Sequence, residues 1–444
     1  MTNAEMMTHE RAAIVSIGDE LILGQALDTN THWLAQRLTE RGIRVVEHVT
    51  VDDDRPRIDA TLRRLAGDVQ CIIMTGGLGP TADDLTREAL ADAMGQTLIE
   101  DPQGLAWLEA IEQARGRTLT AQRRVQAQRP QSASLLPNEH GTAPGIRGAV
   151  DGADVFCLPG PPREMRPMFE QCVEPVLLSP DGRVIRASLL RTFGLPESVV
   201  AERLGALMDR DANPTVGTTA SGGVVTVRIR FEGAEAEAAA AMEAASAQVR
   251  TLVGDVLFGE GETTVPSALV DALRTRGERV LVVESCTAGL IGAMIAGVPG
   301  ASDVFLGGWL TYANAMKSAM VGVPAEWLDM PPGVPPIPGA VSTETAVAMA
   351  EGALRVAAAR GIDAHHALSV TGVAGPRGGT DDKPRGTVVN ARATRGDATD
   401  VRHFLIAGDR SDVRERSATT AMGMLLHHLR GGVPDVMTWQ MENA

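Results

Sequence analysis

Three side chains that could carry out acyl transfer lie in the second half of the sequence. Ser285 follows an apolar stretch, and Tyr312 and Lys317 lie a short distance further along. A hydroxyl nucleophile needs a base that removes its proton and donors that hold the oxyanion it creates. Lys317 and Tyr312 could supply these functions to Ser285 if the fold brings the three together. Tyr312 is the only tyrosine of the chain, and its alternative role is to bond a nearby backbone group through its hydroxyl.

The local sequence predicts how these groups are activated. Ser285 is expected where the strand VLVVE meets the helix TAGLIGAMI, whose first N–H groups have no partner within the helix. Asn314 is expected to cap the next helix and to place Lys317 in its first turn, where the helix dipole disfavours the charged amine. Cys286 is an alternative nucleophile, because a thiolate at a helix N-terminus is stabilised.

A glycine-rich loop over 374–386 follows a predicted strand at 366–372. The loop carries Arg377, Lys383 and Arg385 among flexible backbone amides. This combination suits an anionic group of a substrate, although the same residues would also suit an exposed loop with solvated charges.

Strand and helix signals alternate over residues 1–175 and again over 261–444, with a final helix expected from about 412 to 430. Alternation of this kind predicts parallel sheets covered by helices on both faces. Residues 176–260 instead contain alternating strands and an Ala-rich helix, as in a small α+β module. The predicted fold class is therefore α/β, with two three-layer α/β/α domains joined by a small α+β module.

The composition limits the possible functions. The net charge is −15 and the pI is about 5.1, which argues against nucleic acid as a partner. No apolar run is long enough to span a membrane, and the polar N-terminus does not resemble a secretory signal. The four cysteines are scattered without metal-binding spacing. We expect a cytoplasmic protein with reduced thiols.

The C-terminal motifs resemble the C-terminal domain of the CinA family. They are Glu284-Ser285-Cys286-Thr287-Ala-Gly289, Tyr312-x-Asn314-x-x-Lys317 and Thr371-Gly-Val-Ala-Gly375-Pro-x-Gly378-Gly379-Thr380-x-x-Lys383. The resemblance implies deamidation of nicotinamide mononucleotide (NMN) to nicotinate mononucleotide and ammonia, without a cofactor. It implies that Ser285 is the nucleophile, with Tyr312 and Lys317 as its partners. The substrate contacts that it implies are Glu284, Thr287, Gly289, Asn314, Thr371, Gly375, Gly378, Gly379 and Lys383. The proline-rich stretch 324–338 is longer than the usual connection in the family.

The N-terminal domain carries polar residues where its predicted strands end, which is where ligands of such sheets bind. Its motifs resemble the molybdopterin-binding-like half of the same family, some members of which hydrolyse ADP-ribose with a metal. The residues expected to bind a nucleotide are Gly18, Asp19, Glu20, Asn30, Gly76, Gly77, Gly79, Pro80, Thr81, Asp83, Asn138 and Gly160.

A divalent metal ion is a possible cofactor of this domain, with Asp84 and Asp19 as its expected ligands. Alternatively, Asp83 and Asp84 are acids in the first turn of a helix expected from about 83 to 94. Asp52 stands where the family usually has a glycine. The resemblance also implies a homodimer that acts on small nucleotides, namely NMN and, as in some members of the family, ADP-ribose. The alternative is a non-catalytic protein that binds molybdopterin or senses a nucleotide.

Overall fold

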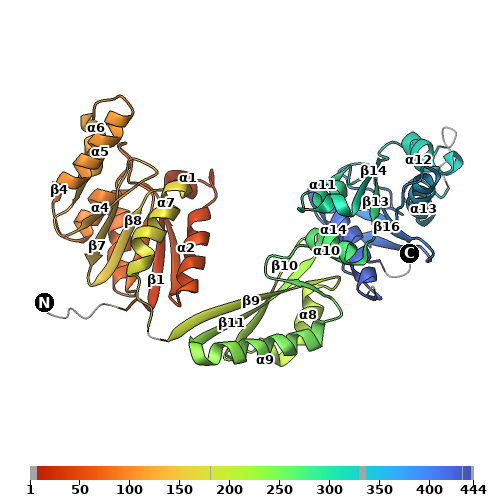
Figure 1. Ribbon diagram of the computed structural model, residues 1–444, viewed down its shortest axis with the longest axis horizontal. Helices are drawn as coiled ribbons and strands as arrows, with labels where there is room; N and C mark the ends of the chain where they lie inside the picture. Colours follow the sequence, from red (N-terminus) through yellow and green to blue (C-terminus); the bar gives the residue numbers. More distant parts are fainter. Residues whose placement is uncertain (1–7, 181, 330–336, 433, 442–444) are drawn as a thin grey trace. The chain divides into compact units, whose positions relative to one another are not determined.

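The computed structural model describes residues 8–180, 182–329, 337–432 and 434–441. The chain forms two compact units, one of residues up to Arg186 together with Phe231–Ala241, and one of Ala187–Arg230 with the residues from Met242 onward. Figure 1 shows the helices and strands of each unit. Part of the proline-rich stretch predicted at 324–338 lies outside the described residues. No helix in the described part of the chain is long and apolar enough to cross a membrane.

The first unit contains a mixed sheet between two layers of helices (Figure 1). In spatial order its strands are β2 (Arg44–Val51), β1 (Arg11–Ile17), β3 (Cys71–Thr75), β8 (Ala153–Leu158), β7 (Gly145–Val150) and β6 (Ser134–Leu136). The strands β2, β1, β3 and β8 are parallel, whereas β7 is antiparallel to both β8 and β6. The carboxyl ends of β1, β2, β3, β6 and β8 therefore lie at one edge of the sheet.

Alternating side chains of the buried strands divide the core of this unit into two layers. One layer packs β1 and β3 against α3 (Arg55–Ala66) and α4 (Thr86–Ala93), and the other packs them against α2 (Thr29–Glu40) and α7 (Pro162–Met168). The remaining elements of this unit are α1 (Asp19–Ile22), β4 (Leu98–Glu100), α5 (Pro102–Ala114), α6 (Ala121–Arg124), η1 (Val125–Ala127), β5 (Gln128–Pro130), η2 (Phe169–Val173) and η3 (Glu174–Val176).

A small antiparallel sheet follows, as expected of the α+β module. Its order is β10 (Thr215–Ser221), β11 (Val224–Ala234), β9 (Arg183–Phe193) and β12 (Leu257–Glu260). The helices α8 (Glu197–Leu204) and α9 (Glu235–Val253) and the short η4 (Gly205–Met208) complete this module, and side chains such as Val200 and Val249 pack against the strand residues Val225 and Val227.

The C-terminal part of the second unit is again a three-layer α/β/α arrangement (Figure 1). Its sheet has the order β14 (Phe305–Leu310), β13 (Val280–Glu284), β15 (His366–Gly372), β16 (Thr387–Thr394) and β17 (Asp400–Leu405). The helices α10 (Val265–Arg276), α11 (Leu290–Ala296) and α14 (Arg410–Leu429) cover one face, and α12 (Asn314–Val321) and α13 (Thr343–Ala359) cover the other. The short helices η5 (Ala301–Asp303) and η6 (Ala325–Trp327) lie in its connections.

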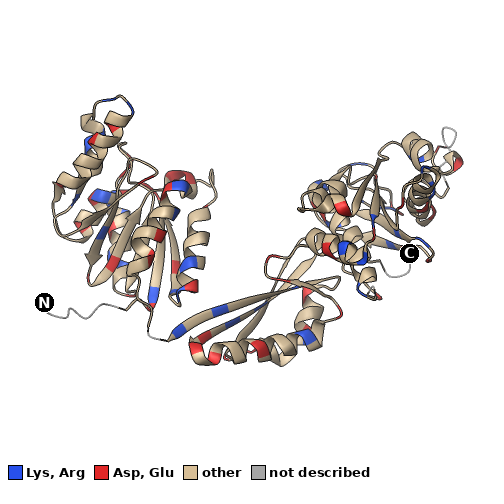
Figure 2. Ribbon diagram, viewed as in Figure 1, with Lys and Arg blue, Asp and Glu red and all other residues tan. Residues whose placement is uncertain are grey.

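The predicted fold class is confirmed, while several helix boundaries differ from the prediction. The helix expected from about 83 starts at Thr86, because the carboxylate of Asp84 holds the preceding loop. The last helix starts at Arg410 rather than near 412, because Asp409 forms a capping box with Asp412. Figure 2 shows Lys and Arg interspersed with Asp and Glu on the helices of both units.

Candidate functional site

The register of the C-terminal sheet brings three chain segments to one edge. Glu284 at the end of β13 pairs with Leu310 of β14 and with Val370 of β15, and the three strands are parallel. Ser285 and Tyr312 therefore leave the sheet at the same edge, together with the start of the glycine-rich loop. Because β17 follows β15 through two antiparallel pairings, it runs in the same direction. The start of α14, Arg410, comes to this edge as well.

Among the described residues at this edge, Lys317 is the one buried lysine. It exposes 2% of its surface, and its Nζ donates to the carbonyl oxygens of Thr311 at 3.0 Å and Tyr312 at 3.4 Å. Burial without a carboxylate partner lowers the pKa of Lys317 below its ordinary value of 10.5. A neutral amine that donates its two hydrogens to these carbonyls still has a lone pair for a proton. Lys317 is thus suited to act as a base.

Ser285 is fixed through its backbone. Its N–H donates to the carbonyl of Val370 at 2.9 Å, and its carbonyl accepts from Ala288 at 3.2 Å. The hydroxyl makes no hydrogen bond to any residue that the structure describes. The amides of Cys286 and Thr287, which follow it, are also without an acceptor in the described ranges. Amides that follow the nucleophile without a backbone acceptor are candidate donors for an oxyanion.

Cys286 does not have the electrostatics of a reactive thiol. Burial raises the pKa of its thiol to about 12, although the charges of Lys317 and Arg410 act in the opposite direction. Both cations are therefore within electrostatic reach of the Ser285–Cys286 turn. The raised pKa argues against the alternative in which this thiolate is the nucleophile.

We expect Cys286→Ala to lower kcat less than about tenfold, because the thiol packs in the core and performs no chemistry. Initial rates of product formation by the full chain measure the effect. Iodoacetamide should also leave the wild-type rate unchanged at pH 8, where the thiol is protonated. Rapid inactivation by alkylation of Cys286 would restore it as the nucleophile.

Tyr312 is paired with a residue that the sequence did not single out. Its ring is 58% exposed, and its hydroxyl accepts from Nη2 of Arg410 at 2.9 Å. The Nη1 of Arg410 donates to the carbonyl of Gly375 at 2.7 Å, which ties the tyrosine to the glycine-rich loop. Arg410 therefore supplies a fixed positive charge where the strand ends meet.

Glu284 has a different position from the substrate contact implied by the resemblance. It is fully buried, and its two carboxylate oxygens accept from the amides of Gly289 at 2.9 Å, Ile291 at 3.1 Å and Gly292 at 2.9 Å. The amides expected to be free at the start of α11 are thus occupied by this carboxylate. Its place in the fold is to hold the turn that carries Ser285.

Three other residues that the resemblance implies as substrate contacts are buried or bond the protein itself. Thr287 is fully buried, and the hydroxyl of Thr371 donates to the carbonyl of Ala340 at 2.6 Å. Asn314 is not the cap of α12 as predicted: Ala313 occupies that position, and the Asn314 side chain donates to the carbonyl of Leu328 at 3.1 Å.

The glycine-rich loop keeps its cations near the sheet edge. Lys383 Nζ donates to the carbonyl of Pro338 at 3.3 Å, and its N–H donates to the hydroxyl of Thr380 at 3.1 Å. Gly375 and Gly378 have φ angles of 82° and 94°, which favour glycine. Gly379 and Gly289 belong to the same edge by their place after β15 and β13.

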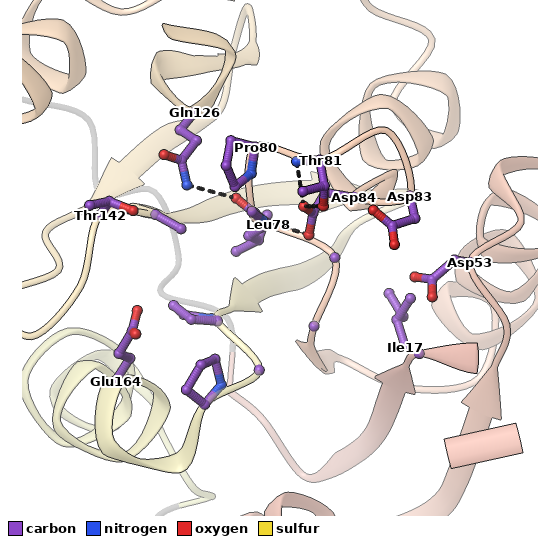
Figure 3. Close-up of a pocket in the computed structure, with 18 of the residues that line it drawn as sticks. Ile17, Asp53, Leu78, Pro80, Thr81, Asp83, Asp84, Gln126, Thr142 and Glu164 are labelled. Carbon is purple, nitrogen blue, oxygen red and sulfur yellow. Dashed lines mark hydrogen bonds between the residues drawn. The ribbon is translucent and has the colours of Figure 1, made fainter. Parts of the chain in front are cut away.

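The second candidate site is a cavity of about 350 Å³ at the carboxyl edge of the first sheet, here named the central cavity (Figure 3). Most of the predicted nucleotide contacts line it, namely Gly18, Glu20, Gly76, Gly77, Gly79, Pro80, Thr81, Asp83 and Gly160, and so does the predicted metal ligand Asp84. Asn30 lines a neighbouring cavity of about 360 Å³, the Asn30 cavity. Asn138 lines another of about 440 Å³, the Trp107 cavity.

The loop after β3 is held from both sides. Asp84 accepts from the amides of Gly79 at 2.7 Å and Thr81 at 2.8 Å, and also from the Thr81 hydroxyl. The buried Arg87 donates to the carbonyls of Leu78 at 2.7 Å and Gly79 at 2.8 Å in the same loop. Within the described glycine run 76–79, the amides of Gly77 and Leu78 have no acceptor, whereas those of Gly76 and Gly79 are occupied, so this run offers fewer free donors to a phosphate than its composition suggested.

Carboxylates surround the central cavity more densely than the sequence analysis recognised. Asp53, at the end of β2, exchanges backbone-to-carboxylate hydrogen bonds with Asp19 at 3.0 and 3.2 Å. Burial raises the pKa of Asp53, and the negative charges of Asp19, Glu20 and Asp83 raise it further. The position of Asp53 after a parallel strand was the signal that could have identified it.

The further lining residues Gln126, Thr142 and Glu164 were also missed (Figure 3). They come from segments far apart in the sequence. In the described part of the chain, no three His, Cys, Asp or Glu side chains are grouped so that they alone could hold a metal ion. The roles of Asp84 and Asp19 as metal ligands remain predictions.

These features define a chain with two α/β domains and a small α+β module. Family models match each part: "Probable molybdopterin binding domain" over residues 13–179, "Damage-inducible protein CinA KH domain" over 187–259, and "CinA C-terminal domain" over 262–429. The chain belongs to the CinA family.

Relatives match over nearly the whole length. A "Putative competence-damage inducible protein" of Symbiobacterium thermophilum is 41% identical over 95% of this chain and 99% of its own. A "CinA-like protein" of Anaeromyxobacter sp. is 41% identical over 94% of this chain and 98% of its own. Among solved structures, "the protein CinA with unknown function" from Thermoplasma acidophilum is 33% identical, with a TM-score of 0.36, over 38% of this chain and 98% of that chain.

Proposed function

We propose that the C-terminal domain deamidates NMN, with Ser285 as nucleophile and Lys317 as its base. The observation that carries this proposal is the buried Lys317 at the edge where Ser285 leaves the sheet, because burial lowers the pKa of its amine and so favours the neutral form. Arg410 and Lys383 at the same edge supply positive charge for the phosphate of a mononucleotide. Membership of the CinA family is consistent with this assignment.

The proposed reaction has two steps, formation of an ester to Ser285 and hydrolysis of that ester. Ser285 Oγ attacks the carboxamide carbon while Lys317 Nζ takes the hydroxyl proton, and the amides of Cys286 and Thr287 hold the oxyanion. Lys317 returns the proton to the departing nitrogen, so that ammonia leaves and an ester to Ser285 remains. Water then attacks the ester with the same base, which releases nicotinate mononucleotide and restores the hydroxyl. Tyr312, oriented by Arg410, positions the ring of the substrate or donates to the developing charge.

The pH profile tests the role of the lysine. We expect kcat to rise with pH through one inflection below 10.5, because only the neutral amine of Lys317 accepts the proton and burial lowers its pKa. Ammonia release from NMN by the full chain, measured between pH 5 and 10, gives the profile. A rate that falls as pH rises would contradict a lysine base, and no ammonia at any pH would contradict the proposed activity itself.

For the N-terminal domain, we propose that the central cavity binds a nucleotide diphosphate and hydrolyses ADP-ribose with a divalent cation. The support is the negative charge around Asp53, which would repel an anionic ligand that arrives alone. Mg²⁺ is commonly held by one or two carboxylates together with substrate phosphates, and Glu20, Asp53 and Asp83 could provide these carboxylates. The cation would neutralise the phosphates, while the free amides of Gly77 and Leu78 orient them.

Asp84→Ala should weaken ADP-ribose binding about tenfold or more, because the amides of Gly79 and Thr81 lose their acceptor and the loop loosens. Calorimetry of the full chain with ADP-ribose and Mg²⁺ measures this change, and chromatography detects AMP. Asp92→Ala, which alters an exposed acid of the next helix, serves as the matched control. Unchanged affinity in Asp84→Ala would show that the loop does not carry the ligand.

One observation favours a second candidate, a non-catalytic nucleotide or molybdopterin sensor. Asp84 already accepts three hydrogen bonds from its own loop, which leaves little capacity for a metal ion. If ADP-ribose binds and no AMP forms with Mg²⁺ or Mn²⁺, the domain is a sensor.

A further inference from the structure

Three cavities of the first unit lie next to one another in a row, with the central cavity in the middle. The central cavity shares Ile17, Glu20, Gly160 and Pro161 with the Asn30 cavity, and it shares Thr142 with the Trp107 cavity. The two outer cavities have no lining residue in common. A ligand long enough to occupy all three cavities would place its ends in the two outer cavities and its middle in the central cavity.

The Trp107 cavity differs chemically from the central cavity. Trp107 and Ile111 of α5 line it together with residues of the loop 137–144, and Trp107 is half-buried. The side chains of Arg115, Glu139 and His140 also line the cavity, and none of them makes a hydrogen bond within the described residues. Apolar walls with a few unpaired polar groups are typical of small-molecule sites.

The wall between the two cavities is fixed in place by one side chain. Asn138 Nδ2 donates to the carbonyl of Ala143 and to the carboxylate of Glu164, both at 2.9 Å. Its Oδ1 accepts from the amide of His140 at 3.0 Å. Asn138 thus links Glu164, which lines the central cavity, to His140, which lines the Trp107 cavity.

We propose that the Trp107 cavity is a nucleobase subsite for the ligand whose phosphates occupy the central cavity, an inference that rests on the proposed nucleotide binding. The indole offers a face on which a planar heterocycle stacks. Arg115, Glu139 and His140, which are exposed, supply polar groups to the lining for the edge of the base. At the other end of the row, Asp28 and Asn30 provide a polar surface for a sugar.

This arrangement matches a ligand with a base, a diphosphate and a second sugar in that order. The carboxylates of the central cavity take the cation that accompanies the diphosphate. Trp107 then contributes to affinity without touching the reacting bond, so its removal should act on binding and leave the phosphate contacts intact.

Calorimetry of the full chain with Mg²⁺ tests the assignment, using ADP-ribose and inorganic pyrophosphate as probes. Trp107→Leu should weaken ADP-ribose binding about tenfold, in line with the loss of one base–aromatic stack. Trp107→Phe should weaken it less than about threefold, because a ring remains. Pyrophosphate, which has no base, should bind all three proteins equally. Glu109→Ala, an exposed position on the same helix, is the control and should change neither affinity.

Fluorescence provides a second measurement that does not depend on a disruptive substitution. Stacking of adenine on Trp107 should quench part of the emission, and Trp107→Phe should remove that quenching while ADP-ribose still binds. ADP-ribose affinity unchanged in Trp107→Leu, or an equal loss for ADP-ribose and pyrophosphate, would overturn the inference alone. Absence of ADP-ribose binding by the wild-type chain would overturn the nucleotide proposal and the subsite together.

Discussion

Ser285→Ala and Lys317→Met should each lower kcat for NMN deamidation by about 10³-fold or more, and the double variant should be no worse than either single one. The reason is that nucleophile and base act as one unit, so loss of either removes the same step. Within the described residues, the buried amine of Lys317 bonds the carbonyls of Thr311 and Tyr312 and forms no ion pair. We therefore expect its main role to be chemical.

Lys383→Met is the matched control for the lysine. Its ammonium lies on the glycine-rich loop and bonds the carbonyl of Pro338, so its loss should raise KM for NMN with little change in kcat. Steady-state ammonia release by the wild type and the four variants separates these effects. If the fold losses in kcat of the two single variants multiply in the double variant, Ser285 and Lys317 act in separate steps.

The second large effect is structural. Glu284→Ala should destabilise the C-terminal domain by about 3–5 kcal/mol, because three amides lose a buried charged acceptor. For a unit of this size the loss corresponds to a fall of roughly 10 °C in its Tm. Calorimetric scans of the full chain report it as a shift of one transition.

Glu284→Gln distinguishes this structural role from a catalytic one. The glutamine amide group would face an N–H donor, so we expect stability and activity to fall together. Glu344→Ala, which removes an acid in the first turn of α13, should leave the transition unchanged. Full stability in Glu284→Gln with loss of all activity would make Glu284 a base and contradict its assignment to the fold.

The sequence was sufficient to predict features that depend on local pattern. The alternation of strands and helices indicated the α/β class, whereas the strand β14 that leads to Tyr312 was not predicted. Ser342 shows how local pattern sets a helix start, because serine favours the cap position and its hydroxyl accepts from the amide of Thr345 at 3.2 Å at the start of α13.

Other features depend on tertiary contacts that local pattern does not reveal. Arg410 joins the site because β17 runs parallel to β15 and Asp409 starts the helix two residues earlier than expected. Asp84 was predicted as a metal ligand, and its carboxylate bonds the amides of Gly79 and Thr81 in its own loop, a contact that the sequence pattern does not reveal. Asn314 stood where a cap was expected, yet its amide reaches Leu328 on a later segment.

Trapping of the covalent intermediate tests the central claim most directly. Full-length protein turning over NMN in the presence of hydroxylamine should form the hydroxamate of nicotinate mononucleotide, because hydroxylamine competes with water for the ester on Ser285. Mass spectrometry should detect this product with the wild-type chain and not with Ser285→Ala, which should also release no ammonia above background. Undiminished ammonia release by Ser285→Ala without hydroxamate would contradict the account and assign the attack to water.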